Sequence, residues 1–349
     1  MRVAPRLHYP VPKSLNLIHQ RLRTSTLPLG RIPTVLDLSV IIVSWNTRDV
    51  LRECLQSVAL GLGAMKAEVF VVDNASTDGS PEMVAHEFPQ FRLIANSTNV
   101  GFAAANNQAI AQATGQYTLL LNPDTVIHKQ VLRRSWEYME QAPEVGALGC
   151  RVLNGDGSVQ LTCGRYPTLW NLVLLSSGLF RCRWPAFLGR YQMLDWDRNS
   201  ERDVETITGC YMFCRTAAIR DIGMLDESFF CYGEETDWCR RFTNGGWILR
   251  FSPVGTITHY GSLSSRQCSH RRDLMLTDGL IRLHRKHGGR LAAVLAWLIL
   301  ASFQMTRWVF WAVASLVGRS VSARKRRDHF GGVVRDFGSL WPIRESFAR

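Results

Sequence analysis

The chain has 349 residues, with 41 basic side chains against 29 acidic ones and a formal net charge of +12. This length is sufficient for one large α/β domain with additions, and the charge is compatible with a polyanion or an anionic membrane as a partner. The nine cysteines are odd in number and include no Cys-x-x-Cys pair. This argues against a domain held together by disulfides and favours a reducing compartment.

The basic charge is concentrated at the two ends of the chain. Residues 1–36 contain six Lys and Arg, and no acidic residue precedes Asp37. Prolines interrupt this segment, and it has no long apolar run of the kind found in secretory signals, so we predict a basic extension outside the fold. A second basic cluster at residues 319–327 begins a predicted C-terminal tail, residues 319–349.

Between residues 39 and 122, apolar β-branched runs alternate with segments that have apolar residues at helical spacing. The former are typical of buried strands and the latter of amphipathic helices. Such alternation predicts an α/β fold with a mostly parallel sheet and right-handed crossovers. The predicted strands are 39–45, 68–73, 91–96 and 116–122, and the predicted helices are 47–59, one that opens at 78–81, and 102–113.

Polar residues follow these strands where α/β domains bind their ligands, at the carboxyl ends of the sheet. Asp73 ends the second strand and can accept the imide N–H of uracil or thymine, while Trp45 can stack on the same base. Asp124 follows the fourth strand and can bind Mg²⁺ or Mn²⁺ on a diphosphate. The alternatives are that Asp73 caps a loop, that Trp45 is core, and that Asn122-Pro123-Asp124 is only a turn.

Beyond residue 153 the pattern is looser, with strands predicted at 206–214, 247–251 and 255–265. Glu234, Glu235 and Asp237 crowd at a predicted helix start. Stabilisation by the helix dipole is the simplest explanation of these acids, but like charges in a cleft also raise one another's pKa and favour a general base. His259 ends a strand and is either structural or a ligand of a metal or phosphate.

Residues 291–318 form one apolar stretch, long enough to span a bilayer at about 1.5 Å per residue. Arg307 in its middle is costly in a lipid-exposed span. Three structures remain open: a tilted span, a shallow hairpin with Arg307 at the headgroups, and a buried helix pair. The basic residues that follow favour the membrane, because they are attracted to the anionic cytoplasmic leaflet.

Taken together, the segments at 39–265 resemble a family 2 glycosyltransferase with the GT-A fold, in the bacterial rhamnosyltransferase-like branch. The resemblance implies a nucleotide-sugar-binding half at 37–153, an acceptor-binding and catalytic half at 154–290, and a membrane-associated segment at 291–318. The segments that carry it are SVIIVSWN, VVDNASTDGS, NVGFAAANN, LLLNPDT, TGCYMFCR, LDESFFCYGEETDWCRR and HYGSLS.

The resemblance also implies residue roles. Asp124 stands at the metal-binding position of an Asp-x-Asp motif whose first acid is here Asn122, and His259 matches a His that can join the metal site. Glu235 occupies the general-base position, where the family often has Asp, and Glu234 is the alternative. The implied catalytic residues are Glu235, Glu234 and Asp237; the implied nucleotide-sugar ligands are Ser44, Trp45, Asn46, Asp73, Asn74, Asn99, Gly101 and Asn122; the implied metal ligands are Asp124 and His259.

The activity implied by the resemblance is inverting transfer of a sugar, with dTDP-rhamnose as the suggested donor and Mg²⁺ or Mn²⁺ as cofactor. The acceptor is a cell-surface glycan or a polyprenyl-diphosphate-linked glycan, at the cytoplasmic face of a bacterial inner membrane. We expect one or a few sugars to be added rather than a long polymer.

Three other functions compete with this interpretation. A nucleotidyltransferase or another nucleotide-sugar enzyme explains Asp73 and Asp124 but not the acids at 234–237 followed by His259. A non-catalytic membrane-bound scaffold predicts that these acids are lost, and they are present. Nucleic acid is not an expected partner, because the basic charge lies in the flanks.

Overall fold

The computed structural model describes residues 36–179, 188, 191–261, 269–317 and 320–342. Nearly all of the predicted N-terminal extension lies outside these ranges. Arg319 of the second basic cluster, the end of the predicted tail at 343–349, and the last part of the predicted 255–265 segment lie outside them as well.

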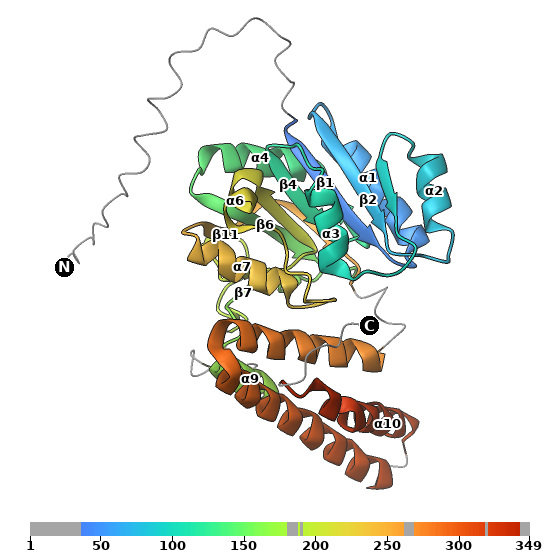
Figure 1. Ribbon diagram of the computed structural model, residues 1–349, viewed down its shortest axis with the longest axis vertical. Coiled ribbons are helices and arrows are strands. Elements are labelled where there is room, and N and C mark those ends of the chain that lie inside the picture. Colours follow the sequence, from blue (N-terminus) through green and yellow to red (C-terminus); the bar gives the residue numbers. More distant parts are fainter. Residues whose placement is uncertain (1–35, 180–187, 189–190, 262–268, 318–319, 343–349) are drawn as a thin grey trace, which may run out of the picture. The chain divides into compact units, whose positions relative to one another are not determined.

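A central sheet organises the described residues (Figure 1). Its first part consists of four parallel strands in the order β3 (Arg92–Ala95), β2 (Ala67–Asp73), β1 (Leu38–Ser44) and β4 (Tyr117–Leu121). Helices connect these strands, and β1, β2 and β4 are almost completely buried, as expected for strands covered on both faces. The predicted parallel α/β half is therefore confirmed.

The rest of the sheet is mixed. β10 (Tyr211–Arg215) runs antiparallel to both β4 and β6 (Val145–Leu153), and β11 (Ile248–His259) lies parallel to β6. β5 (Thr125–Ile127) and β8 (Arg202–Asp203) pair with β11 in the antiparallel sense. The expectation of a mostly parallel sheet thus holds for the N-terminal half, while β10 reverses direction beside β4.

Two predicted strand patterns differ from the structure. The predicted strand 206–214 is two strands separated by a turn, because β9 (Thr206–Ile207) pairs with β7 (Cys163–Gly164) in a separate two-stranded sheet. The predicted strands 247–251 and 255–265 are instead one strand, β11. Its pairing with β6 is irregular between Phe251 and Thr256, where Pro253 has no N–H for the ladder.

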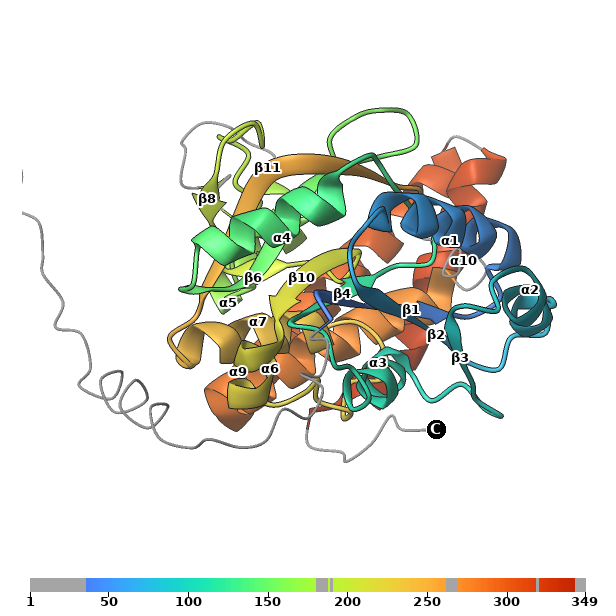
Figure 2. The same ribbon diagram turned by 90° about the horizontal axis from the view of Figure 1, so that it is seen from above.

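Helices cover both faces of the sheet (Figure 2). Buried residues of α1, α2 and α4 belong to one apolar core, and buried residues of α3, α6 and α7 belong to a second core on the opposite face. The helix bounds are α1 (Arg48–Leu62), α2 (Ser80–Glu87), α3 (Phe102–Ile110), α4 (Val131–Gln141), α6 (Thr216–Ile222) and α7 (Glu234–Asn244).

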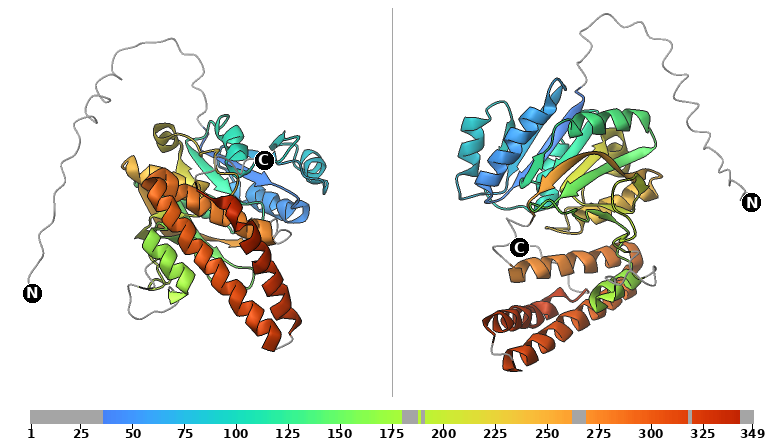
Figure 3. Two further views of the ribbon diagram at one scale, coloured as in Figure 1. Left: turned by 60° about the horizontal axis from the view of Figure 1, so that its bottom comes forward. Right: turned by 180° about the vertical axis from the view of Figure 1, so that it is seen from behind.

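The C-terminal region is helical and packs against α5 (Leu169–Ser177) (Figure 3). It consists of α9 (Ser269–Val317), α10 (Val321–Asp336) and the short helix η3 (Phe337–Leu340). α9 is broken at Gly289, where φ is 78° and ψ is −174°. α10 packs alongside the second half of α9, and buried residues of α9, α10 and η3 form a third apolar core.

In the described part of the chain, α9 is long and apolar enough to cross a membrane by length and composition. Only 22% of its most apolar window is buried within the protein, so the expected alternative of a buried core helix pair does not describe it. The helix also continues through Arg307 without a turn, so the chain does not fold back at that residue.

A close backbone contact joins α9 to the loop before α7. A Cβ placed on Gly279 of α9 would lie 2.2 Å from the carbonyl oxygen of Tyr232. Tyr232 itself has φ of 72° and Gly233 has φ of 99°, so this loop adopts left-handed conformations that only a specific packing arrangement sustains. Any side chain at position 279 would therefore push α9 and this loop apart.

We predict that Gly279→Ala lowers the free energy of unfolding by about 1–3 kcal/mol, the usual cost of overpacking. Gly332→Ala in α10 is the matched control, because its Cβ would meet the His270 ring at an ordinary 3.5 Å. Alanine is the better helix former by up to about 1 kcal/mol, so the control should be neutral or stabilising. Denaturant unfolding followed by tryptophan fluorescence measures both. Equal stability of Gly279→Ala and the wild type would contradict the contact.

Candidate active site

Asp73 at the end of β2 offers one free carboxylate oxygen to a ligand. The side chain is only 2% exposed, and its Oδ2 accepts a hydrogen bond from the Ser76 backbone N–H at 2.8 Å. Its Oδ1 is buried and has no hydrogen-bond partner among the described residues. A buried acceptor left in this state is costly, so an added N–H donor to Oδ1 would be favourable.

β1 ends at Ser44, beside Asp73, and Trp45 and Asn46 follow it. The Ser44 carbonyl oxygen accepts the Asn74 N–H at 2.8 Å, and Asn46, in a left-handed conformation with φ of 52°, accepts the Thr77 N–H on its Oδ1 at 2.8 Å. These bonds fix the loop that carries Asp73. Trp45 is half-buried at the same strand end. Ser44 and Asn46 therefore shape the site through their backbone and loop contacts.

A chain of contacts connects the Asp73 loop to the segment before α7. Asn74 Nδ2 donates to the Gly101 carbonyl oxygen at 3.2 Å, and the Gly101 N–H donates to Asn99 Oδ1 at 3.0 Å. A Cβ on Gly101, which has φ of 89°, would lie 2.5 Å from the Phe230 carbonyl oxygen. That oxygen also accepts the Phe102 N–H at 2.7 Å. Position 101 thus requires glycine, because two segments meet there.

Asp124 and His259 form a pair at the ends of β4 and β11. His259 Nε2 lies 3.2 Å from Asp124 Oδ1, and Asn122 Nδ2 lies 3.2 Å from the same ring nitrogen. The other ring nitrogen, Nδ1, is 2.7 Å from Gln160 Oε1. Gln160 in turn donates from Nε2 to Asn154 at 2.8 Å, which orients its amide oxygen toward the histidine. His259 Nδ1 therefore carries a proton, and Nε2 faces Asp124.

This arrangement fits a divalent cation. An unprotonated Nε2 and a carboxylate oxygen are both acceptors, so a cation could bind between them in place of the Asn122 N–H that now donates to Nε2. The hydrogen bond from Nδ1 to Gln160 fixes the imidazole tautomer and is typical of metal-binding histidines. The described residues contain no group of three or more His, Cys, Asp or Glu able to hold a metal. A cation here would therefore take its remaining ligands from water and a bound diphosphate.

Glu234 and Glu235 begin α7, where the helix dipole favours negative charge. Burial raises the pKa of Glu234 well above its usual range, and the neighbouring Glu235 raises it further. Burial also raises the pKa of Glu235, while backbone donors and a hydrogen bond from Glu234 act in the opposite direction. The Oε2 atom of each is buried without a partner among the described residues. Of the two carboxyl groups, Glu234 therefore keeps its proton more strongly, and Glu235 is the better proton acceptor.

Asp237 lies within ion-pair distance of three basic residues of the protein. Its side chain is 0% exposed, and its two oxygens lie 2.9 Å from Arg241 Nε, 2.8 Å from Lys286 Nζ and 2.8 Å from His287 Nε2. Lys286 and His287 belong to α9. These contacts favour a role for Asp237 in fastening α9 to α7 over the catalytic role that the sequence suggested.

β2, which ends at Asp73, and β4, which ends three residues before Asp124, have their carboxyl ends at one edge of the sheet. Ser44 is in register with Asp73, and Ile42 with Leu121, so the ends of β2 and β4 lie about 10 Å apart, two strand spacings. Between Asp124 and Glu235 lies the buried thiol of Cys210. Burial raises the pKa of Cys210 to about 12, and the charges of Asp124 and Glu235 both add to the rise.

Sequence reasoning missed Gln160, Lys286 and His287. Gln160 lies in a loop without a recognisable motif, 99 residues from His259. Lys286 and His287 precede the apolar stretch and look like part of an ordinary basic surface. Each of these three residues is identified only by a tertiary contact, and local sequence patterns do not indicate such contacts.

Comparisons with known proteins identify the family of the chain. The sequence model described as "Glycosyl transferase family 2" matches residues 39–217. An N-acetylglucosaminyl-diphospho-decaprenol L-rhamnosyltransferase of Mycobacterium tuberculosis is 26% identical over 320 residues, which cover 83% of this chain and 95% of that protein. A low-salt glycan biosynthesis hexosyltransferase of Haloferax volcanii is 28% identical over 209 residues, 59% of this chain and 61% of that protein.

Among solved structures, a mannosyltransferase from Pyrobaculum calidifontis in complex with GDP-Man and Mn²⁺ is similar with a TM-score of 0.49. It is 16% identical in sequence, and the match covers 88% of both chains.

We predict that Gln160→Leu weakens Mn²⁺ binding about 10- to 100-fold, the usual effect of removing the hydrogen bond behind a metal-binding histidine. Asp124→Asn should weaken it further, because the carboxylate charge is lost. His128→Gln is the control, since His128 is an exposed histidine whose ring bonds to Thr258 Oγ1 at 3.0 Å. Electron paramagnetic resonance of free Mn²⁺, with a nucleoside diphosphate present, gives the affinities. Unchanged affinity in both variants would mean that a proton, and not a metal, bridges the pair.

Proposed function

Since the matched segment covers 179 of 349 residues, the chain belongs to glycosyl transferase family 2 and is a glycosyltransferase with the GT-A fold, and we propose that it moves one sugar from a nucleotide diphosphate donor to a hydroxyl of a lipid-linked glycan, with inversion. The observation that carries this proposal is that β2, which ends at Asp73, and β4, which ends three residues before Asp124, finish at one edge of the sheet, while Glu235 at the start of α7 and Asp124 both lie near Cys210. That edge is where ligands bind in open α/β sheets.

On the donor side, Asp73 Oδ1 would accept the imide N–H of a pyrimidine base, and Trp45 would cover the base. Asp124 and His259 would hold Mg²⁺ or Mn²⁺, which when bound neutralises charge on the departing diphosphate. Asn122 Nδ2, which lies 3.2 Å from His259 Nε2, would give up this contact when a cation binds to that nitrogen. Asn74, Asn99 and Gly101 keep the base-binding loop close to the start of α7.

On the acceptor side, Glu235 Oε2 would take the proton of the acceptor hydroxyl. The hydroxyl oxygen then forms a bond to the anomeric carbon as the bond from that carbon to the diphosphate breaks, and this single displacement inverts the configuration. The pKa of Glu235 is raised toward pH 7, and a pKa near the working pH suits a general base. Glu234 keeps its proton and donates it as a hydrogen bond to Glu235, which orients the base.

The relative from Mycobacterium tuberculosis supports a specific donor and acceptor, because its name describes transfer of L-rhamnose to a decaprenyl-diphosphate-linked sugar. We therefore propose rhamnose, from dTDP-rhamnose, as the sugar and a polyprenyl-diphosphate-linked glycan as the acceptor. A nucleotidyltransferase on the same sheet would use Asp73 and Asp124 but would leave Glu235 without a role.

A lipid-linked acceptor requires a membrane-bound enzyme, and we propose that α9 lies on the cytoplasmic face of the membrane. Most of its exposed apolar residues lie on one broad face of the helix, as in interfacial helices. A spanning α9 is disfavoured because α10 packs beside it with its basic residues, and Arg326 lies 4.6 Å from the Trp311 ring. Spanning would draw these charges into hydrocarbon. The exposed large apolar residues of α9 are Leu291, Leu295, Leu298, Met305, Trp308, Val309, Phe310, Val313, Leu316 and Val317.

The test is a screen of the purified full chain against a panel of nucleotide sugars with Mg²⁺ or Mn²⁺. Release of nucleoside diphosphate is followed with and without polyprenyl-diphosphate-linked acceptors. We expect release that depends on the acceptor, with the dTDP-rhamnose donor preferred. Absence of acceptor-dependent release with every donor in the panel would overturn the proposal.

We predict that Glu235→Gln lowers transfer by at least about 100-fold, the lower end of general-base contributions, while donor affinity stays unchanged. Glu234→Gln should retain most activity, because the amide still donates a hydrogen bond to Glu235. In the wild type, activity should fall as the pH drops through the raised pKa of Glu235, above the range of an exposed glutamate. Steady-state rates over a pH series measure all three. If Glu234→Gln were inactive and Glu235→Gln active, the base would be Glu234.

A further inference from the structure

Lys286 of α9 joins the two ends of the segment that carries Glu235. Its Nζ lies 2.6 Å from Asp226 Oδ2 and 2.8 Å from Asp237 Oδ1, and we call this pair of contacts the Lys286 clasp. We propose that Lys286 and its neighbour His287 are positioning residues for the general base of the proposed transfer. The inference rests on the proposed function and adds to it the residues outside α7 that hold the base in place.

The segment joined by the clasp has little regular structure of its own. Residues 226–233, which lead into α7, consist of turns and bends. Tyr232 and Gly233 have φ of 72° and 99°, and a bulky residue in the left-handed region is strained. A loop in such a conformation keeps its shape only where the surrounding contacts hold it there. Lys286 supplies one contact of this kind at each end of the segment.

Asp237 transmits the contact with α9 to α7. Its side chain is 0% exposed, and it lies in the same first turn of α7 as Glu235. A buried carboxylate is costly unless basic groups pair with it. Lys286 Nζ and His287 Nε2 both lie 2.8 Å from Oδ1, while Arg241 Nε lies 2.9 Å from Oδ2. The two contacts from α9 therefore converge on one oxygen, and a shift of α9 would remove both of them.

The backbone of α7 connects Asp237 to the base. The Asp237 N–H donates to the Gly233 carbonyl oxygen at 2.8 Å, which closes the first turn of the helix around Glu235. Within one turn, the backbone fixes the direction in which each side chain leaves the helix. Anchoring the carboxylate of Asp237 therefore also sets the direction of Glu235. Lys286 and His287 act on the base through Asp237 and this helical turn.

His287 extends the contact to the segment that precedes α5. Because a carboxylate only accepts hydrogen bonds, His287 Nε2 carries the hydrogen that it shares with Asp237. The His287 ring meets the Tyr166 ring edge-on, with their centres 6.2 Å apart. Arg240 of α7 lies over the same tyrosine, 4.8 Å from its ring centre. His287 is thus held by Tyr166 in the orientation that directs its N–H to Asp237.

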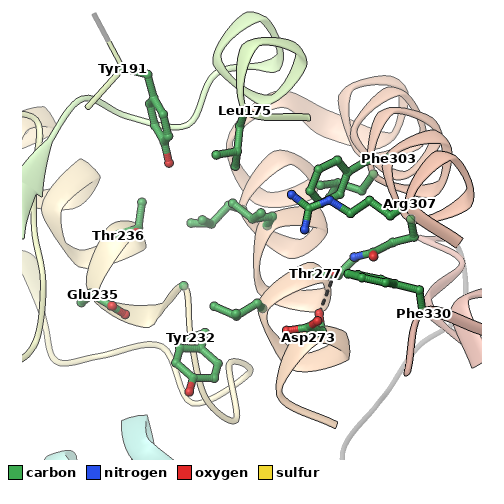
Figure 4. Close-up of a pocket in the computed structure, with 16 residues that line it drawn as sticks. Leu175, Tyr191, Tyr232, Glu235, Thr236, Asp273, Thr277, Phe303, Arg307 and Phe330 are labelled. Carbon is green, nitrogen blue, oxygen red and sulfur yellow. Dashed lines mark hydrogen bonds between the residues drawn. The ribbon is translucent and has the colours of Figure 1, made fainter. Parts of the chain in front are cut away.

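A third contact brings the tip of the same loop against α9. A Cβ placed on Gly233 would lie 3.2 Å from the Gly279 Cα, in addition to the close approach of Gly279 to Tyr232. Figure 4 shows Tyr232 and Glu235 beside the first half of α9, with which they line a cavity of about 360 Å³. α9 therefore holds the tip of the loop through Gly279 and both of its ends through Lys286.

The first test is hydrogen exchange on the full chain, which requires no substrate. We expect Lys286→Met to speed exchange of the hydrogen-bonded amides at 226–237 about 10-fold, a moderate effect because the Lys286 side chain is 34% exposed. Exchange in β1 and β4 should stay unchanged. Arg282→Met is the matched control, because Arg282 also belongs to the first half of α9 but pairs with Asp278 of the same helix at 2.6 Å. Equal exchange at 226–237 in Lys286→Met and the wild type overturns the inference.

The second test is kinetic. Lys286→Met should lower kcat about 10- to 100-fold, the loss expected when a catalytic group moves by about 1 Å, and leave KM for the donor unchanged. The stoichiometry of nucleoside diphosphate binding with Mn²⁺ counts the folded sites, so kcat per site separates a displaced base from partial unfolding. His287→Leu should act in the same direction. His287→Gln should recover most of the rate, since its amide still offers an N–H to Asp237.

The two tests distinguish a failure of this inference from a failure of the proposed function. If the wild type is active and kcat per site is unchanged in Lys286→Met and His287→Leu, the two residues do not position the base, and the inference is wrong while the transferase proposal stands. If exchange at 226–237 depends on Lys286 but the wild type turns over no donor with any acceptor, the clasp is supported and the proposed transfer is wrong.

Discussion

The ion pairs around Asp237 hold the two halves of the candidate site together. Asp237 on α7 is fully buried, and Lys286 and His287 on α9 supply two of its three basic partners. Lys286 also lies 2.6 Å from Asp226, and although partial burial raises the pKa of Asp226, hydrogen bonds from Lys286 and Ser228 outweigh it and lower that pKa to about 2. Because Asp237 is buried, loss of these partners would leave its carboxylate with less compensating charge and destabilise this contact. The segment 226–237, which carries Glu235, therefore depends on α9 for its position.

The two sides of the site are built from different kinds of structure. The proposed donor side, with Asp73 and Asp124, uses the ends of strands within one sheet, where the register fixes the positions of side chains. The proposed acceptor side, with Glu235, uses a loop in left-handed conformations and helices that pack on it. A rigid sheet suits the recognition of an invariant nucleotide and cation. A loop that is held by separate helices can differ among relatives without disturbing the sheet, which suits the recognition of a variable acceptor.

Local patterns were enough to predict most of the sheet and the polar residues that follow its strands. Apolar runs located β1, β2 and β4, and Asp73 and Asp124 lie where those runs end. The pairing of β10 beside β4 in the antiparallel sense was not predictable, because strand direction depends on partners far away in sequence. The same is true of Gln160 behind His259 and of the contact between Gly279 and Tyr232. These features arise from packing between distant segments, which leaves no periodic signal in either one.

α9 links the proposed membrane surface to the catalytic segment. One face of this helix exposes apolar side chains, another packs against α10, and the first half contacts the loop before α7 through Gly279. If α9 lies on the membrane as proposed, it holds the segment that carries Glu235 at the bilayer surface. A chain that lacks α9 would lose two of the three basic partners of Asp237, so α9 would support the proposed site as well as attach it to the membrane.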